Sequence, residues 1–125
     1  MEYNVNVYQV VYRPESTDME KERVLVRTMC GGVPSSEEFD KYYENVCSLK
    51  VNSDIDNVME FCEYCFYILN DGNIDNVDNV DSIECHHPCR SLSVGDILEV
   101  NSKFYLVKMS GFDEFATDNA LEKTI

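Results

Sequence analysis

The residues best able to do chemistry in this sequence lie in two short stretches that together hold four cysteines and two histidines. They are Cys62 and Cys65 in CEYC, followed after nineteen residues by Cys85, His86, His87 and Cys89 in CHHPC. Counted as cysteines alone, the pattern is C-x2-C-x19-C-x3-C, which lies within the spacing range of structural zinc sites. Zinc in such sites takes four thiolate or imidazole ligands in a tetrahedron. The sequence therefore predicts a structural zinc ion.

The two halves of this predicted site differ in how firmly the ligands are assigned. Cys62 and Cys65 are the firmest candidates, because residues three apart on a helix share one face and can reach one ion. The third and fourth ligands stay open among the residues of CHHPC. Cys85 with Cys89 would give a site of four thiolates, and either His86 or His87 in place of one cysteine would give a less negative site.

Enzymatic uses of these residues are not expected. A redox-active CxxC pair needs a helix N-terminus to lower the thiol pKa, whereas Cys62 and Cys65 are expected in the middle of a helix. The zinc-hydrolase motif H-E-x-x-H and the deaminase pair H-x-E and P-C-x-x-C are both absent from the sequence. The remaining cysteines, Cys30 and Cys47, are expected to be small buried apolar side chains. We therefore expect a binding protein and not an enzyme.

Strands and helices must bring these stretches together. Asn4 to Arg13 and Glu22 to Met29 are rich in Val and predict two antiparallel strands. Ser35 and Glu38 then form a capping-box pattern. With the apolar residues that follow at helical spacing, this pattern predicts a helix from Ser36 to Leu49.

The second half of the chain predicts one more helix and a β-hairpin. The helix covers Ile55 to Asn70, with Asp54 as its N-cap. Asn73 to Glu84 has an apolar residue at every third position, which suits a short helix or an irregular loop and does not suit a strand. Arg90 to Val100 and Phe104 to Phe112 flank the turn Asn-Ser-Lys and predict the hairpin.

Together these elements predict a small α+β domain. Its antiparallel strands would be an N-terminal pair and a C-terminal hairpin, packed with two helices and stapled by the zinc site. No linker divides the chain, so residues 1–125 are expected to form one domain with an acidic insertion at about residues 71–84. The start has no signal-peptide pattern, and no apolar run is long enough to cross a membrane, so a cytoplasmic location is expected.

The charge of the chain is strongly one-sided. The sequence has 24 Asp and Glu residues against 10 Lys and Arg, a formal net charge of −14. This excess disfavours direct contact with nucleic-acid phosphates or an anionic membrane, and favours a partner with a basic surface. Between Lys50 and Arg90 there are nine acids and no base. Such a block is either a solvated face or a surface presented to a basic groove. The second interpretation predicts partner contacts at Asp71, Asp75, Asp78, Asp81 and Glu84.

Several stretches of the sequence carry a family resemblance. They are VYQVVY near the start, YYENVCSL followed by VMEFCEYCFYILN, and HHPCRSLSVGDILEV with FYLVKMSGFDEF. In these stretches the chain resembles the YodL-like domains of plasmid, phage and conjugative-element proteins of Gram-positive bacteria. The likeness covers about Val7 to Phe115. It departs from the family at Asn73 to Glu84 and in the placement of the four cysteines.

The resemblance implies an origin on a mobile genetic element, where small proteins that counter host defence are common. In size and charge the chain looks like an anti-CRISPR protein. That likeness implies binding to a basic surface of the RNA-guided type II CRISPR nuclease and a block of DNA loading. The alternative is an accessory or regulatory protein of the mobile element, with structural zinc and no role against host defence.

Overall fold

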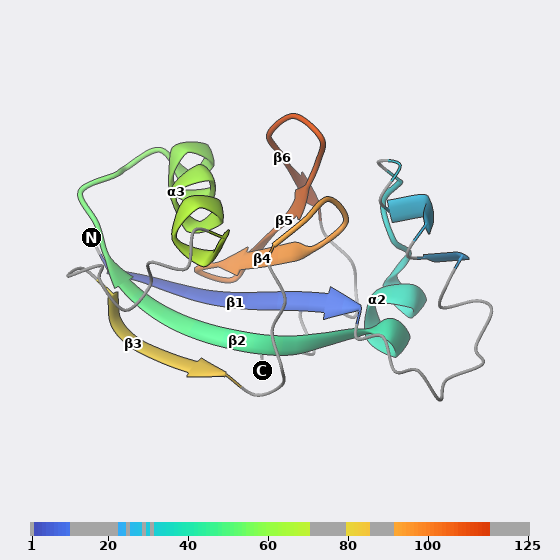
Figure 1. Ribbon diagram of the computed structural model, residues 1–125, viewed down its shortest axis with the longest axis horizontal. Helices are drawn as coiled ribbons and strands as arrows, with labels where there is room; N and C mark the ends of the chain where they lie inside the picture. Colours follow the sequence, from blue (N-terminus) through green and yellow to red (C-terminus); the bar gives the residue numbers. More distant parts are fainter. Residues whose placement is uncertain are drawn as a thin grey trace.

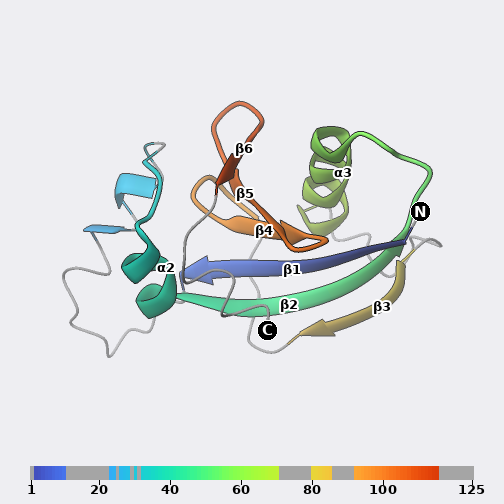
Figure 2. The same ribbon diagram turned by 180° about the vertical axis from the view of Figure 1, so that it is seen from behind.

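The computed structural model describes residues 2–10, 23–24, 26–28, 30, 32–70, 80–85 and 92–115, apart from the side chains of Ser36, Cys85 and Phe115. In this part of the chain, six strands form one antiparallel sheet in the order β3-β2-β1-β4-β5-β6. Figure 1 shows α3 over one end of the sheet and α2 at the other end of β1, and Figure 2 shows the same arrangement from behind. The structure is a small α+β domain, as the sequence predicts.

Strand β1 (Glu2–Val10) lies near the centre of the sheet. It pairs with β2 (Tyr43–Asn52) on one side and with β4 (Ile97–Val100) on the other. Val5 belongs to one buried apolar cluster and Tyr8 to a second one. Because successive side chains of a strand point to opposite faces, the sheet carries apolar packing on both faces.

Helix α2 (Ser36–Tyr42) begins with the capping box that the sequence predicts. The Ser35 hydroxyl accepts a hydrogen bond from the Glu38 N–H at 3.2 Å, and the Glu38 carboxylate accepts one from the Ser35 N–H at 2.8 Å. The buried ring of Phe39 packs against the Tyr8 ring, with 5.2 Å between their centroids. Helix α2 therefore covers the second apolar cluster.

Helix α3 (Val58–Asn70) packs on the first apolar cluster, which lies on the opposite face of the sheet. It begins after Asn57, whose side-chain oxygen accepts hydrogen bonds from the N–H groups of Met59 at 2.9 Å and Glu60 at 3.2 Å. The prediction that Asp54 caps this helix was wrong, because Asn57 occupies that position and Asp54 is exposed.

The C-terminal part of the sheet is a three-stranded meander. Strand β4 is followed by β5 (Lys103–Val107) and then by β6 (Phe112–Phe115), each antiparallel to the strand before it. Asn101 and Ser102 join β4 to β5 with positive φ angles of 49° and 72°, as the favoured two-residue hairpin turn requires. The predicted hairpin is present, but its strands are shorter than expected: residues 92–96 are not a strand, β5 ends at Val107, and Phe112 belongs to the additional strand β6.

Two predictions in the first half of the chain were wrong. Residues 23–24 and 26–28 are helical and do not form a strand. In this helical segment the Thr28 hydroxyl donates a 2.9 Å hydrogen bond to the Val24 carbonyl, one helical turn earlier. The helix expected to reach Leu49 ends at Tyr42, because the chain from the next residue onward pairs with β1 as β2.

A third correction concerns the acidic segment before CHHPC. Val80–Cys85 forms the edge strand β3, antiparallel to β2, where we expected the three-residue spacing to exclude a strand. The rest of that segment, residues 71–79, lies outside the described residues, as do the end of the first predicted strand, the loop at 14–21 and the C-terminal tail. No helix in the described ranges is long and apolar enough to cross a membrane.

Candidate functional site

The CEYC stretch lies on the side of α3 that packs against the sheet. Cys62 and Cys65 are both fully buried and belong to the apolar cluster under that helix. Burial raises the pKa of the Cys62 thiol to about 12, and the Glu63 carboxylate adds to the shift. Burial, and after it the neighbouring Cys62, also raise the pKa of the Cys65 thiol. Both side chains are therefore protonated thiols at neutral pH unless a cation holds them as thiolates.

Backbone pairing brings a third predicted ligand residue towards this cluster. Strand β3 places the backbone of Cys85 directly opposite Cys47, and Cys47 is buried in the cluster that contains Cys62 and Cys65. The other predicted ligands lie outside the described residues: His86, His87 and Cys89. Within the described residues, no three His, Cys, Asp or Glu side chains are grouped so as to hold a metal ion. The burial expected for Cys47 is confirmed, whereas Cys30 is exposed and the prediction for it was wrong.

The C-terminal end of α3 holds the chain that follows CHHPC. The Asn70 side chain accepts a 2.6 Å hydrogen bond from the Leu92 N–H and donates one of 2.9 Å to the Leu92 carbonyl. Leu92 is the first described residue after CHHPC, and its side chain is buried under α3. The end of the helix that carries CEYC is thus hydrogen-bonded to the chain three residues after Cys89.

The SVGD stretch after Leu92 is a structural turn. Buried Asp96 accepts hydrogen bonds from the Ser93 N–H at 2.9 Å and from the Gln9 side chain at 3.1 Å. Gly95 has a φ of +94°, and its carbonyl accepts a 2.6 Å hydrogen bond from the Tyr43 hydroxyl. These contacts lock the turn that leads into β4, so the residues serve the fold.

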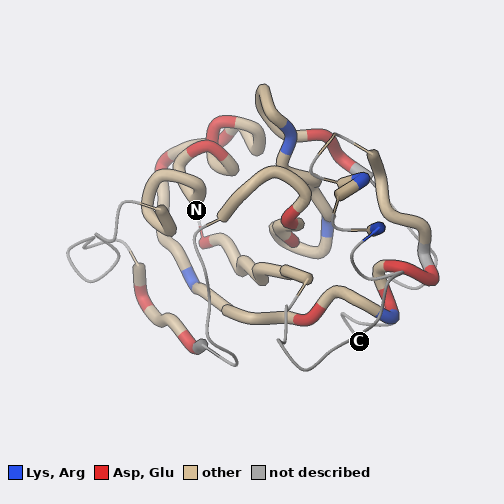
Figure 3. Tube along the Cα trace, turned by 45° about the vertical axis from the view of Figure 1, so that its right-hand side comes forward, with Lys and Arg blue, Asp and Glu red and all other residues tan. Residues whose placement is uncertain are grey.

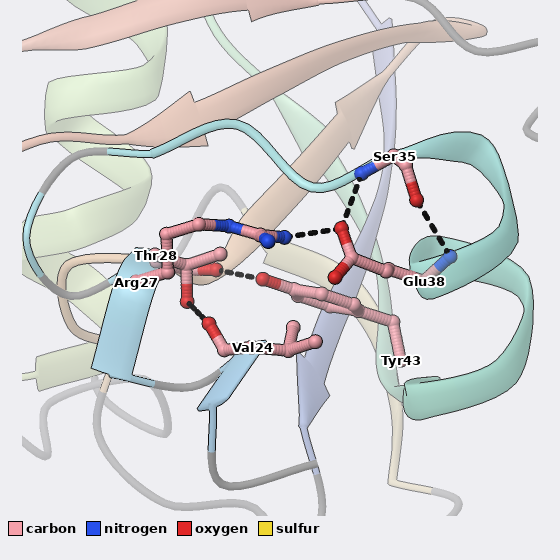
Figure 4. A network of polar contacts seen from close by, with 7 residues as sticks. Val24, Arg27, Thr28, Ser35, Glu38 and Tyr43 are labelled. Atoms are coloured by element: carbon pink, nitrogen blue, oxygen red, sulfur yellow. Dashed lines mark hydrogen bonds and ion pairs between the residues drawn. The ribbon is translucent and has the colours of Figure 1, made fainter. Parts of the chain in front are cut away.

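A polar network surrounds the Tyr43 ring where the helical residues 23–24 and 26–28 meet α2 (Figure 4). Arg27 of that segment forms an ion pair with the Glu38 carboxylate of the capping box. Partial burial opposes ionisation of Glu38, but hydrogen bonds from Ser35 and Arg27 outweigh it and lower the pKa of the carboxyl. The network therefore ties a second helical piece to the start of α2.

A row of polar residues crosses four strands of the sheet. Glu84, Ser48, Asn6 and Glu99 are successive partners on β3, β2, β1 and β4. Ser48 donates a 2.6 Å hydrogen bond to the Asn6 side chain, which donates one of 2.6 Å to the buried Glu99 carboxylate. The Tyr8 hydroxyl donates to the same carboxylate at 3.2 Å. Burial, and then the charge and hydrogen bond of Glu99, raise the pKa of Tyr8.

The sequence patterns did not single out this row. The available signal was in GDILEV, where Asp96 and Glu99 flank two apolar residues that must be buried. A carboxylate that is buried in a sheet needs hydrogen-bond donors from neighbouring strands.

The acidic surface predicted from the sequence is present in part. Asp81 and Glu84 lie on the edge strand β3, and both are exposed. The other three predicted partner residues lie outside the described residues: Asp71, Asp75 and Asp78. Helix α3 adds exposed Glu60 and Glu63, and neither α3 nor β3 contains a Lys or Arg. In Figure 3 the acidic segments of α3 and β3 both lie on the left of the view, with β2 between them; β2 carries exposed Lys50 opposite Ser82.

Comparison with known proteins adds no assignment. No protein-family model matches this chain, and no curated protein and no solved structure matches it. The likeness to YodL-like domains therefore stays a prediction from the sequence motifs, and function has to be argued from the charge, burial and contacts of this chain.

Proposed function

We propose that this chain is an acidic, non-enzymatic binding protein that inhibits a protein with a basic, nucleic-acid-handling surface. The target that we propose is the RNA-guided type II CRISPR nuclease, and the step blocked is DNA loading. One observation carries the proposal: α3 and β3 expose carboxylates and contain no Lys or Arg.

The physical argument is one of charge complementarity. Such nucleases hold guide and target in positively charged channels that contact the nucleic-acid backbone. Exposed carboxylates such as Asp81, Glu84 and Glu63 present negative charge that competes with phosphates for the same Lys and Arg side chains. Complementary charge also speeds the encounter of two proteins, and this effect weakens as salt is added.

We further propose a structural zinc ion held by Cys62, Cys65 and two residues of CHHPC. Three contacts support it: the two thiols share one buried cluster, the Cys85 backbone lies opposite Cys47 in that cluster, and Asn70 holds Leu92. Zinc would fasten α3 to the end of β3, the strand that precedes β4 in the chain, and its binding free energy would add to folding stability.

The inhibitor proposal is tested with the purified nuclease in complex with its guide RNA. We expect the protein to bind this complex, to block DNA binding, and to lose affinity steeply as the salt concentration rises. The variant Asp81→Lys/Glu84→Lys is expected to bind at least about tenfold more weakly, a loss of about 1.4 kcal/mol or more. The matched control is Glu37→Lys/Asp40→Lys on α2, which makes the same charge change on exposed residues away from β3. Absence of binding, or DNA cleavage unaffected by saturating protein, would contradict the proposal and favour the mobile-element accessory protein.

The zinc proposal is tested by elemental analysis of protein purified without a chelator. We expect one zinc ion per chain, and none in Cys62→Ala. Cys47→Ala is the matched control, because it removes another buried thiol of the same cluster and is expected to keep the metal. Protein with no zinc would show that Cys62 and Cys65 act only in apolar packing.

A further inference from the structure

A groove opens between α3 and the hairpin formed by β5 and β6. Its volume is about 210 Å³, and it is lined by Glu63 and Phe66 of α3 and by residues 107–109, 111 and 112 of the hairpin. The Phe66 and Phe112 rings meet edge to face across it, with 6.5 Å between their centroids. The Lys108 N–H donates a 3.0 Å hydrogen bond to the Gly111 carbonyl, which closes the tip of the hairpin. The groove is thus bounded by two regular, hydrogen-bonded elements.

Large apolar side chains are exposed at this groove and beside it. Met109 at the hairpin tip is 84% exposed, Tyr67 is 53% exposed and Phe66 is 37% exposed. Met59 lies two turns before Phe66 on the same face of α3 and is also exposed. Exposed apolar side chains that gather in one patch mark an interaction site more often than single ones do. Methionine and aromatic residues are well suited to such a site, because they adapt to or anchor a partner side chain.

The rim of the groove is acidic. Glu60 and Glu63 are exposed on the α3 side, and Glu114 is exposed on the same face of β6 as Phe112. The one basic residue in the lining is Lys108, whose ammonium group lies 3.5 Å from the Asp113 carboxylate. An apolar centre inside a charged rim is the usual composition of a protein interface.

We propose that this groove is the anchor site for an extended segment of a partner protein that carries one or two large apolar side chains flanked by Lys or Arg. The apolar side chains enter between Phe66 and Met109, and the flanking bases face the carboxylates of the rim. A second copy of this chain fits poorly, because it would bring an equally acidic rim against this one. This inference rests on the proposed function, because it assumes a basic partner. It adds the surface of this chain that holds the partner.

The absence of tryptophan from the chain allows a direct test without the nuclease. The probe is the synthetic peptide Lys-Arg-Trp-Leu-Arg-Lys, whose tryptophan is the only one in the mixture. We expect a saturable blue shift of its fluorescence on titration with the protein, which added salt weakens. The peptide Glu-Asp-Trp-Leu-Asp-Glu carries the same anchors with the opposite charge, and N-acetyl-tryptophanamide carries the anchor alone. Both are expected to show no saturable shift at the same concentrations.

Variants locate the binding. Phe66→Gln and Met109→Gln are each expected to weaken the basic peptide about tenfold, which corresponds to about 1.4 kcal/mol. Ile83→Gln on β3 is the matched control, because Ile83 is 41% exposed and lies outside the groove. Glu63→Gln is expected to weaken binding severalfold, and Glu37→Gln on α2, which is exposed away from the groove, is expected to leave it unchanged. Circular dichroism and thermal unfolding check that each variant keeps the fold.

Three results would overturn the inference: no saturable shift with the basic peptide, equal binding of the acidic peptide, or equal losses in the groove variants and in Ile83→Gln. A dimer in sedimentation that is lost in Met109→Gln would assign the groove to a second copy instead. The test contains no nuclease, so failure of the nuclease to bind would contradict the proposed target and leave this result standing. If the nuclease binds Phe66→Gln and Met109→Gln as tightly as the wild type, the groove is not its anchor site, and the proposed target is not contradicted.

Discussion

The side chain of Asn70 forms two hydrogen bonds with the backbone of Leu92, one with its N–H and one with its carbonyl. Asn70 is the last residue of α3, and Leu92 is separated from β4 only by the SVGD turn. An amide side chain is one of the few groups that can donate and accept in this way. The two hydrogen bonds therefore resemble the pair that two opposite residues exchange in an antiparallel sheet. They join the end of α3 to the loop before β4.

Replacement of Asn70 is expected to destabilise the protein in a pH-dependent way. Asn70→Ala loses both hydrogen bonds and is expected to cost about 1–3 kcal/mol of unfolding free energy. Asn70→Asp keeps the acceptor but, when ionised, faces the Leu92 carbonyl without a proton. The loss of unfolding free energy in Asn70→Asp relative to the wild type should therefore become smaller below about pH 4, where the carboxyl is protonated and can donate a hydrogen bond. Urea unfolding of the three proteins at pH 7 and pH 3.5 measures this, and a deficit that is equal at both pH values would contradict it.

The capping box of α2 is expected to carry measurable stability at neutral pH. Ser35→Ala should cost about 1 kcal/mol of unfolding free energy, whereas Glu37→Gln, in the same turn but outside the box, should change it little. The pKa of Glu38 is lowered in the folded protein. Its contribution is therefore complete above the ordinary glutamate pKa of about 4.3, and it is lost as the pH falls below that value. Urea unfolding between pH 3 and pH 7 tests this. In Glu38→Gln the unfolding free energy is expected to fall less steeply as the pH is lowered than in the wild type.

Gly95 should not tolerate a side chain. Its φ is +94°, and a Cβ at this position would lie 2.8 Å from the Thr28 hydroxyl oxygen. Backbone strain and steric clash both oppose Gly95→Ala, so we expect a loss of about 2 kcal/mol or more. Gly111→Ala is the control, because Gly111 has a φ of +79° but nothing lies within 4 Å of a Cβ built there. This variant should lose stability only through backbone strain. Thermal unfolding compares the two, and equal losses would exclude a role for the Thr28 contact.

Tyr8 is expected to ionise later than an ordinary tyrosine as the pH rises. Burial and the Glu99 carboxylate raise its pKa, so the neutral phenol stabilises the folded state. That contribution is complete below the ordinary tyrosine pKa of about 10 and is lost as the pH rises beyond it. Glu99→Gln should bring the Tyr8 titration to lower pH without restoring the ordinary value, because burial remains. NMR of ring-labelled tyrosine follows this, and an unchanged Tyr8 titration would exclude the influence of Glu99.

The parts of the fold that the sequence predicted correctly depend on local signals. The capping box at Ser35 and Glu38 marks the start of α2, and Asn101-Ser102 marks the β4–β5 turn, because each depends only on contacts within a few residues. The end of α2 was missed for a physical reason. Between Val7 and Tyr8 the pairing of β1 with β2 shifts register, and this irregularity breaks the alternating pattern that would identify β2 as a strand.

The candidate site was predictable only as a set of residue types. Cys62 and Cys65 are on a helix, as expected, but their complete burial in the apolar cluster follows from how α3 lies on the sheet. The buried position of Glu99 could not be predicted, because its hydrogen-bond donors, Asn6 and Tyr8, come from a distant part of the chain. The groove beside Phe66 likewise exists only where the β5–β6 hairpin meets α3. Contacts between distant segments carry no local signal in a single sequence.

The position of β1 also has a consequence for synthesis of the protein. Val5 pairs with Leu49 on one side and with Val100 on the other, so this strand is translated before both of its neighbours and receives β4 last. At about 5–20 residues per second, the β1–β2 pair waits roughly 2–10 s with one open edge before β4 emerges. Such long-range pairing also slows folding. During synthesis the unpaired edge of β1 is therefore open to edge-to-edge association with other chains.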